Sequence, residues 1–160
     1  MRAGLFVIAI VVLSGCSVFE WLGQSGDMQQ ATGIQEANSA ANADVTFVRA
    51  VQNGDTWTFH VTVAHPDTGW EDYADGWDVV LPDGTVIKPD AESPFTRLLL
   101  HPHENEQPFT RSQSGIIIPE SITQVTVRAH DLVDGFGGQE IVVDFTQDIS
   151  DFYEVVRGNS

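Results

Sequence analysis

Residues 101–111 form the segment of this chain whose side chains are best equipped for chemistry. They hold two of the five histidines in the chain, together with two glutamates and an arginine. His101 and His103 are two residues apart, which places both rings on one side of an extended segment. With His65 they supply nitrogen donors for zinc or copper(II). The expected fourth ligand is a nearby carboxylate, namely Glu106 in the set that we favour, or else Asp67 or Glu104.

A structural role is the alternative for the same side chains, and it is the commoner outcome for polar residues in loops. Loop groups lack partners in a β-ladder, so buried ones are generally paired elsewhere within the protein. In this interpretation His65 and His101 hydrogen-bond to the backbone and lock the loops, while Glu106 pairs with Arg111. Calcium is a further alternative, although no EF-hand spacing occurs. Its ligands would come from Asp67, Asp72, Asp75, Asp131 and Asp134.

The N-terminus determines the expected compartment. Arg2 precedes an apolar run of nine residues, 5–13, which is too short for a membrane span of about 20 residues and suits the core of a signal peptide. The run ends in Leu13-Ser14-Gly15-Cys16, which resembles the bacterial lipobox. The resemblance implies cleavage after residue 15, attachment of diacylglycerol to the Cys16 thiol and acylation of the new N-terminus. The alternatives are an uncleaved membrane helix and an ordinary secretory signal.

Lipidation of Cys16 would define both the anchor and the thiol chemistry of the mature chain. Several acyl chains anchor a protein stably, so we expect a protein of the bacterial cell envelope held to the membrane by its N-terminus. Ser17 in place of Asp favours the outer membrane, facing the periplasm, by analogy with Gram-negative sorting. Cys16 is the only cysteine, so neither a disulfide nor a thiolate metal ligand remains. Residues 16–43 are small and polar, as expected for the lipidated cysteine and a flexible tether.

The charge of the chain is strongly negative. It has 23 acidic and 7 basic residues, for a formal net charge of −16, and removal of residues 1–15 would also remove Arg2. Such a surface repels phosphate backbones and anionic lipids, which argues against nucleic acid as a partner and against a polybasic membrane patch. It allows cationic partners or divalent metals, and its ordinary consequence is solubility.

Alternation of apolar and polar residues indicates β-strands through most of residues 44–146. The clearest strand is 56–64, in which Trp57 and Phe59 begin a series of alternate apolar residues. Residues 44–52 and 123–131 alternate in the same way, and Asn53-Gly54-Asp55 is a hairpin signal. Further extended segments are expected at 76–81, 85–88, 95–100, 108–118 and 140–145.

About seven short strands separated by turn signals predict an all-β domain over residues 44–146. We expect an immunoglobulin-like (fibronectin-III-like) antiparallel sandwich, with a β-barrel as the alternative. Trp57 and Trp77 look similar to the core tryptophans of such modules, although the antibody-type disulfide is absent. Residues 147–160 are expected to be a short C-terminal tail, either helical over 148–156 or frayed.

Strand directions bring three loops to one end of the predicted sandwich. These are residues 65–75, 101–107 and 131–138, provided that the segment 89–94 only kinks a continuous return strand. Loops gathered at one end of a rigid scaffold are a common recognition surface. We expect the loop aromatics to cover the core, with exposed recognition residues as the alternative, because such side chains can bury about 150–250 Å² each. The expected members of this loop cluster are Asp67, Trp70, Tyr73, Gln107, Arg111 and Asp131.

Three sequence patterns together resemble a family of uncharacterised bacterial envelope proteins. The first runs from His65-x-Asp67 to Trp77, the second is His101-Pro102-His103-x-x-Glu106-Gln107-Pro108-Phe109-Thr110-Arg111-Ser112, and the third runs from Arg128-Ala129-x-Asp131 to Gly138. The similarity covers most of residues 56–138. The family pattern lacks the insertion at 89–94, which favours a continuous return strand. The family has no assigned activity, so the resemblance implies no reaction.

Signatures of catalysis are missing from the sequence. It has no Gly-x-Ser-x-Gly elbow and no glycine loop that cradles phosphate. Ser112 and Ser114 are near His101 in the chain, but no spacing indicates a base and the group that would orient it. We therefore expect a non-catalytic lipid-anchored module that binds an unknown envelope protein or ligand, or that is structural. A zinc or copper(II) lipoprotein is the second hypothesis, and an envelope hydrolase is the third.

Overall fold

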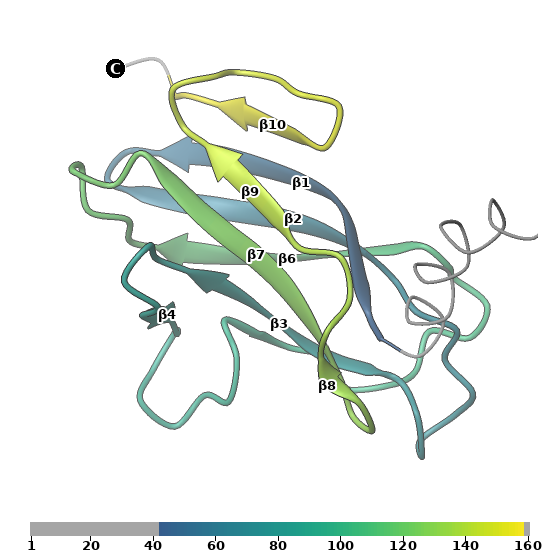
Figure 1. Cartoon of the computed structure of the whole chain (residues 1–160). Helices are drawn as coiled ribbons and strands as arrows, with labels where there is room; N and C mark the ends of the chain where they lie inside the picture. The colour runs from purple at the N-terminus through teal and green to yellow at the C-terminus, as the bar shows by residue number, and fades with distance from the viewer. Residues whose placement is uncertain (1–41, 159–160) are drawn as a thin grey trace, which may run out of the picture. The chain divides into compact units, whose positions relative to one another are not determined.

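Two β-sheets make up the part of the chain that the computed structural model describes, residues 42–158 (Figure 1). The first sheet contains, in spatial order, β10 (Tyr153–Val156), β1 (Asp44–Asn53), β2 (Thr56–Ala64) and β6 (Phe109–Ile116). The second contains β4 (Val86–Ile87), β3 (Ala74–Val80), β7 (Gln124–Asp131) and β8 (Gly135–Phe136), with β5 (Arg97–Leu98) also on β3 and β9 (Ile141–Asp144) also on β7.

The all-β prediction is confirmed. No helix occurs in residues 42–158, and so none there is long and apolar enough to cross a membrane. The two separate sheets exclude the barrel alternative and are consistent with a sandwich. The predicted signal peptide, Cys16 and nearly all of the predicted tether lie outside the described residues.

The core lies between the sheets because alternate residues of the long strands point inward. In β2 the buried positions begin at Trp57 and Phe59, and in β7 they begin at Val125 and Val127. Trp77 of β3 is fully buried. The period-2 pattern therefore correctly identified the strands that carry the core.

The segment that follows β3, residues 86–98, runs back along one edge of β3. Residues 88–96 form an excursion away from that edge. Val86 and Ile87 pair with Val80 and Val79, and after the excursion Arg97 pairs with Trp77. The prediction that the segment 89–94 only interrupts a return strand of constant direction is confirmed.

Thr96 closes the gap that the excursion leaves in the ladder. Its Oγ1 accepts a hydrogen bond from Val79 N at 2.8 Å and donates one to Ile87 O at 2.5 Å. Its backbone N–H donates to Asp78 Oδ1 at 3.0 Å. These bonds satisfy buried groups that would otherwise be unpaired, which is costly in a core.

The C-terminal segment is a strand, so the prediction of a helical or frayed tail over 148–156 is wrong. β10 pairs in parallel with β1, with Val48 opposite Tyr153 and Ala50 opposite Val155. Tyr153 and Val155 are buried, whereas Glu154 between them forms an ion pair with Arg49 at 2.7 Å. The short alternation of this segment fits a strand, and the free edge of β1 provides its partner.

The loop end of the domain is the end at which residues 65–73, 101–107 and 132–138 connect the strands. Hydrogen bonds link these loops: His103 N donates to Asp67 Oδ2 at 2.6 Å, and Leu132 N donates to Tyr73 O at 3.1 Å. The predicted convergence of the three loops is thus confirmed.

The chain enters β1 at this same end. Asp44 pairs with Ala64, Val45 N donates to Gln139 O at 2.9 Å, and Gln139 N donates to Asp44 Oδ1 at 2.6 Å. Gly138 lies so close to the backbone of Ala43 that a Cβ there would be 2.2 Å from its carbonyl oxygen. The first residues of β1 are therefore packed against the loop end.

Candidate functional site

A buried histidine flanked by carboxylates forms the centre of the loop end. His65 directly follows β2, whose inward positions include Val61 and Val63, and it occupies the next inward position. Asp131 occupies the same kind of position at the end of β7, after Val127 and Ala129. Because the two strands end at the same end of the two sheets, their last inward side chains meet.

Both ring nitrogens of His65 face carboxylates. Nδ1 lies 2.7 Å from Asp67 Oδ1, and Nε2 lies 2.5 Å from Asp131 Oδ2. All three side chains are at most 1% exposed. The structural alternative correctly placed His65 in a lock between loops, but its partners are carboxylates and not the predicted backbone groups.

Asp67 is the best-satisfied of the buried acids. Oδ1 accepts a hydrogen bond from Ala74 N at 3.1 Å as well as facing His65, and Oδ2 accepts one from His103 N at 2.6 Å. These bonds satisfy a buried carboxylate that would be costly to leave unpaired. Asp67 thereby holds the loop 65–73 to the segment 101–107.

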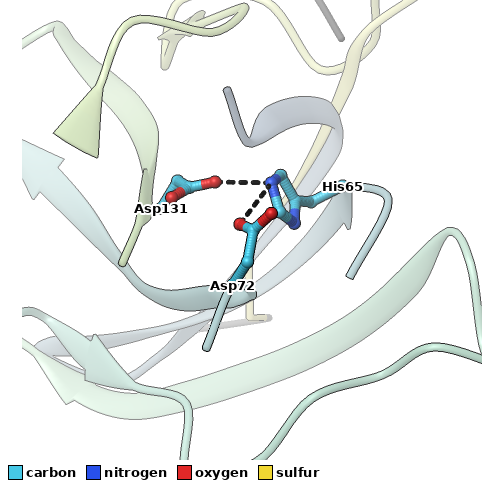
Figure 2. Close-up of side chains that lie close together, drawn as sticks. All are labelled: His65, Asp72 and Asp131. Carbon is cyan, nitrogen blue, oxygen red and sulfur yellow. Dashed lines mark ion pairs between the residues drawn. The ribbon is translucent and has the colours of Figure 1, made fainter. Parts of the chain in front are cut away.

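Asp72 brings a third carboxylate to the same histidine. Figure 2 shows the carboxylates of Asp72 and Asp131 pointing at one ring nitrogen of His65. Asp72 Oδ1 is 3.8 Å from His65 Nε2, and its side chain is 39% exposed. One ligand atom from each of these three residues lies within 4.8 Å of the other two. Among the described residues, these three therefore form a group whose ligand atoms are close enough to hold one metal ion.

His103 is buried beside this network but does not join it through its ring. Its ring stacks on Phe109 with centroids 3.8 Å apart, and neither ring nitrogen has a hydrogen-bond partner. Nδ1 is 3.9 Å from Asp67 Oδ2. Burial lowers the pKa of His103, and the nearby charge of Arg111 lowers it further. The ring is therefore held neutral near pH 7.

The other predicted metal ligands are directed elsewhere. His101 is exposed, and its Nδ1 is 3.1 Å from Pro102 O. Glu106 forms an ion pair with Arg111 at 2.8 Å, as the structural alternative predicted, and this hydrogen bond lowers the pKa of Glu106. Within residues 42–158 the set His65, His101, His103 and Glu106 is not gathered into one group of ligands.

Gln107 and Tyr73 have supporting roles at the loop end. Gln107 Oε1 accepts a hydrogen bond from His65 N at 3.0 Å, and its Nε2 donates to His103 O at 3.4 Å. Tyr73 is half-buried and meets Trp70 edge-on, with ring centroids 6.1 Å apart. Gln107 therefore joins the loops, as expected for a member of the cluster.

Trp70 is exposed, so the expectation that it covers the core is wrong for this residue. It is 67% accessible and stands at the edge of a hollow of about 390 Å³. Gly69, with φ 125°, and the Gly69–Asp72 bridge turn the chain sharply here. That turn directs Trp70 outward. The hollow is lined by Trp70, His101, Pro102, His103, Glu104, Asn105 and Glu106.

Comparison with known proteins identifies one informative relative. A protein of Halomicrobium mukohataei described as "Putative lipoprotein" is 36% identical in an alignment 145 residues long, and the match covers 76% of this chain and 68% of the relative. The chain belongs to this lipoprotein family. No family model and no solved structure matches it. The expectation of a membrane-anchored envelope lipoprotein is confirmed at this level.

Asp72 and Asp131 were expected from the sequence as ligands only in the calcium alternative and not as partners of His65, and one of them carried a usable signal. In residues 125–131 every second residue is apolar until Asp131, so alternation alone places that acid inward. Asp72 has no such pattern, because it lies in an irregular loop among 23 acidic residues. Its partner could be identified only from the fold.

Proposed function

We propose that this lipoprotein is a non-catalytic binding module whose loop end recognises a cationic segment of another envelope protein. In this proposal Cys16 carries the lipid anchor and the two sheets form an immunoglobulin-like sandwich. The observation that carries the proposal is the 67% exposure of Trp70 at the edge of the hollow. An exposed tryptophan beside a hollow is typical of recognition surfaces.

The charges around the hollow favour a cationic partner. Glu104 and Glu106 line it, and both are exposed. The whole chain has a net charge of −16, which attracts cations from a distance. A lysine or arginine side chain placed over the face of Trp70 would gain about 0.5–1 kcal/mol from the cation–π interaction at an exposed site.

The buried network beneath the hollow supports binding because it fixes the shape of the loops. The bonds of Asp67 to the backbone of Ala74 and His103 join two of the three loops, and the contact between His65 and Asp131 brings in the third. A surface that is already ordered loses less conformational entropy on binding. The loops therefore act as a preformed surface.

The location of the His60–Ser112 contact in the first sheet does not suit a hydrolase. Ser112 Oγ lies 2.7 Å from His60 Nδ1, which is within the reach that a nucleophile and its base require. However, the pair lies across the neighbouring strands β2 and β6, it is exposed, and neither residue lines the hollow. A hydrolase would need this pair in a cleft that holds a substrate.

Peptide titration tests the proposed function. The full chain, purified in detergent, is titrated with lysine- and arginine-containing peptides and with acidic peptides of the same length. We expect binding of the basic peptides only, weakened about tenfold by Trp70→Ala, in line with the large share of binding energy that an aromatic anchor contributes. Glu104→Gln should weaken it as well. Ile117→Ala is the matched control, because Ile117 is equally exposed at 67% and does not line the hollow. Equal affinity of Trp70→Ala and the wild type would contradict the proposal.

A further inference from the structure

We propose that His65, Asp72 and Asp131 bind a divalent metal ion of the zinc class. The ligand atoms would be His65 Nε2, Asp72 Oδ1 and Asp131 Oδ2, which lie within 4.8 Å of one another. One imidazole nitrogen and two carboxylate oxygens are a donor set that suits zinc, which often leaves a fourth position for water in sites with three protein ligands. This set shares only His65 with the zinc or copper(II) set expected from the sequence, and it shares Asp72 and Asp131 with the calcium alternative.

Asp67 orients the histidine for this role. Its Oδ1 lies 2.7 Å from His65 Nδ1, so that nitrogen carries the ring proton in the metal-binding form and Nε2 presents its lone pair to the other two acids. Backbone hydrogen bonds from Ala74 and His103 fix Asp67 in turn. A carboxylate behind the ligating histidine is the usual support of such ligands, because it sets the tautomer and raises ligand basicity.

The polar atoms around Nε2 are those of an unsatisfied site. Asp72 Oδ1 and Asp131 Oδ2 are buried atoms without a hydrogen-bond partner, and the whole side chain of Asp131 is 0% exposed. Both carboxylates point at His65 (Figure 2). With Asp67, three carboxylates surround one imidazole, so even a protonated ring leaves excess negative charge in a buried place. A dication neutralises more of that charge than a proton does.

The distances show which ligand would have to move. At metal–ligand distances of about 2.0–2.2 Å, ligand atoms of a tetrahedral site are about 3.3–3.6 Å apart. The 3.8 Å between His65 Nε2 and Asp72 Oδ1 is close to this range, whereas the 2.5 Å between His65 Nε2 and Asp131 Oδ2 is shorter than two ligands of one ion allow. Metal binding would therefore require Asp131 to withdraw by about 1 Å. Because ligand groups must be deprotonated to bind a metal, the affinity should rise with pH.

Zinc titration of the full chain in detergent, after treatment with EDTA and its removal, tests the proposal. We expect one zinc per chain, a higher Tm with zinc, and weaker binding at pH 6 than at pH 8. Asp72→Asn should lower the affinity at least tenfold while the circular dichroism stays unchanged, because its half-exposed side chain is not part of the core. The matched control is Glu71→Gln, which removes the same charge from the adjacent exposed position.

Three results would overturn the metal site. The first is absence of stoichiometric zinc at pH 8, and the second is equal weakening by Glu71→Gln and Asp72→Asn, which would indicate a general effect of charge. The third is loss of zinc in a His101→Ala/His103→Ala variant together with retention in Asp72→Asn, which would move the metal to the histidine pair. Trp70→Ala should leave zinc binding unchanged, so this test and the peptide test fail independently.

Discussion

Removing the carboxylate of Asp131 should destabilise the domain more than any other single change at the loop end. Its side chain is fully buried, with Oδ2 2.5 Å from His65 Nε2. Oδ1 accepts hydrogen bonds from the backbone N–H groups of Val133 at 2.5 Å and Asp134 at 2.9 Å. Asp131→Ala would leave these two donors without their acceptor and His65 Nε2 without its neighbouring carboxylate.

The expected cost follows from the kind of interaction that is lost. A buried donor left without its acceptor typically costs about 1–3 kcal/mol, so the loss of the acceptor for two backbone donors, together with the loss of the contact to His65, places Asp131→Ala at about 3–5 kcal/mol. Asp131→Asn keeps an acceptor oxygen for the loop and can donate to a neutral His65. It should therefore cost only about 1–2 kcal/mol, which is the difference between charged and neutral hydrogen bonds.

Urea unfolding followed by tryptophan fluorescence measures these costs, because Trp77 is fully buried and becomes exposed on unfolding. EDTA is present throughout, so that bound metal does not contribute to the stability. Asp134→Asn is the control, since it removes one exposed charge from the same loop. An Asp131→Ala variant within about 1 kcal/mol of the wild type, against the expected 3–5, would refute the inference that this network holds the loops together.

Three further perturbations test other parts of the structure. His103→Phe keeps the stacking on Phe109 and removes two unpartnered nitrogens, so it should be at least as stable as the wild type at pH 7.5. Burial lowers the pKa of His103 in the folded chain, so as the pH falls through about 6.5, the ordinary pKa of histidine, the unfolded chain takes up a proton first. The wild type should therefore lose stability relative to His103→Phe toward pH 5. Urea midpoints of the two proteins that stay parallel over this pH range would contradict this expectation. Thr96→Val should cost about 2–4 kcal/mol in urea unfolding, because Val79 N and Ile87 O lose their partner in the core. Raising the NaCl concentration from about 0.01 to about 1 M should raise the Tm of the domain. The added salt shortens the Debye length from about 30 to about 3 Å and so screens the repulsion between acidic residues in a chain of net charge −16. An unchanged or lower Tm would show that this repulsion does not limit stability.

The strands with long alternation were predictable because their pattern reports directly on burial. β1, β2 and β7 were placed correctly, and the Asn53-Gly54 turn has the positive φ of 62° at Gly54 that such a hairpin uses. β10 was not predicted as a strand, because four residues carry too little pattern. Its stability comes from pairing with β1, about a hundred positions away in the sequence.

The candidate site was predictable in place but not in membership. The directions of the strands brought the right loops together, and His65 lies at the centre of the loop end. The choice of His101 and His103 as its partners rested on local spacing, whereas the structure pairs His65 with Asp67 and Asp72 of its own loop and with Asp131 at the end of β7. Asp131 meets the histidine because strands of different sheets end side by side, and this information is not local in the sequence.

The entry of the chain at the loop end has a mechanical consequence. Asp44 begins β1 beside Ala64 and is bonded to Gln139, so tension along the N-terminal segment enters the domain next to the loops. If the anchor pulls from this end while a partner is held by Trp70 and the hollow, both forces act on the same end of the domain. The load path then runs through the loop end and does not stretch the sheets from one end to the other. The long strands would be spared, and the first contacts to yield would be those of Asp44 and the adjoining loops.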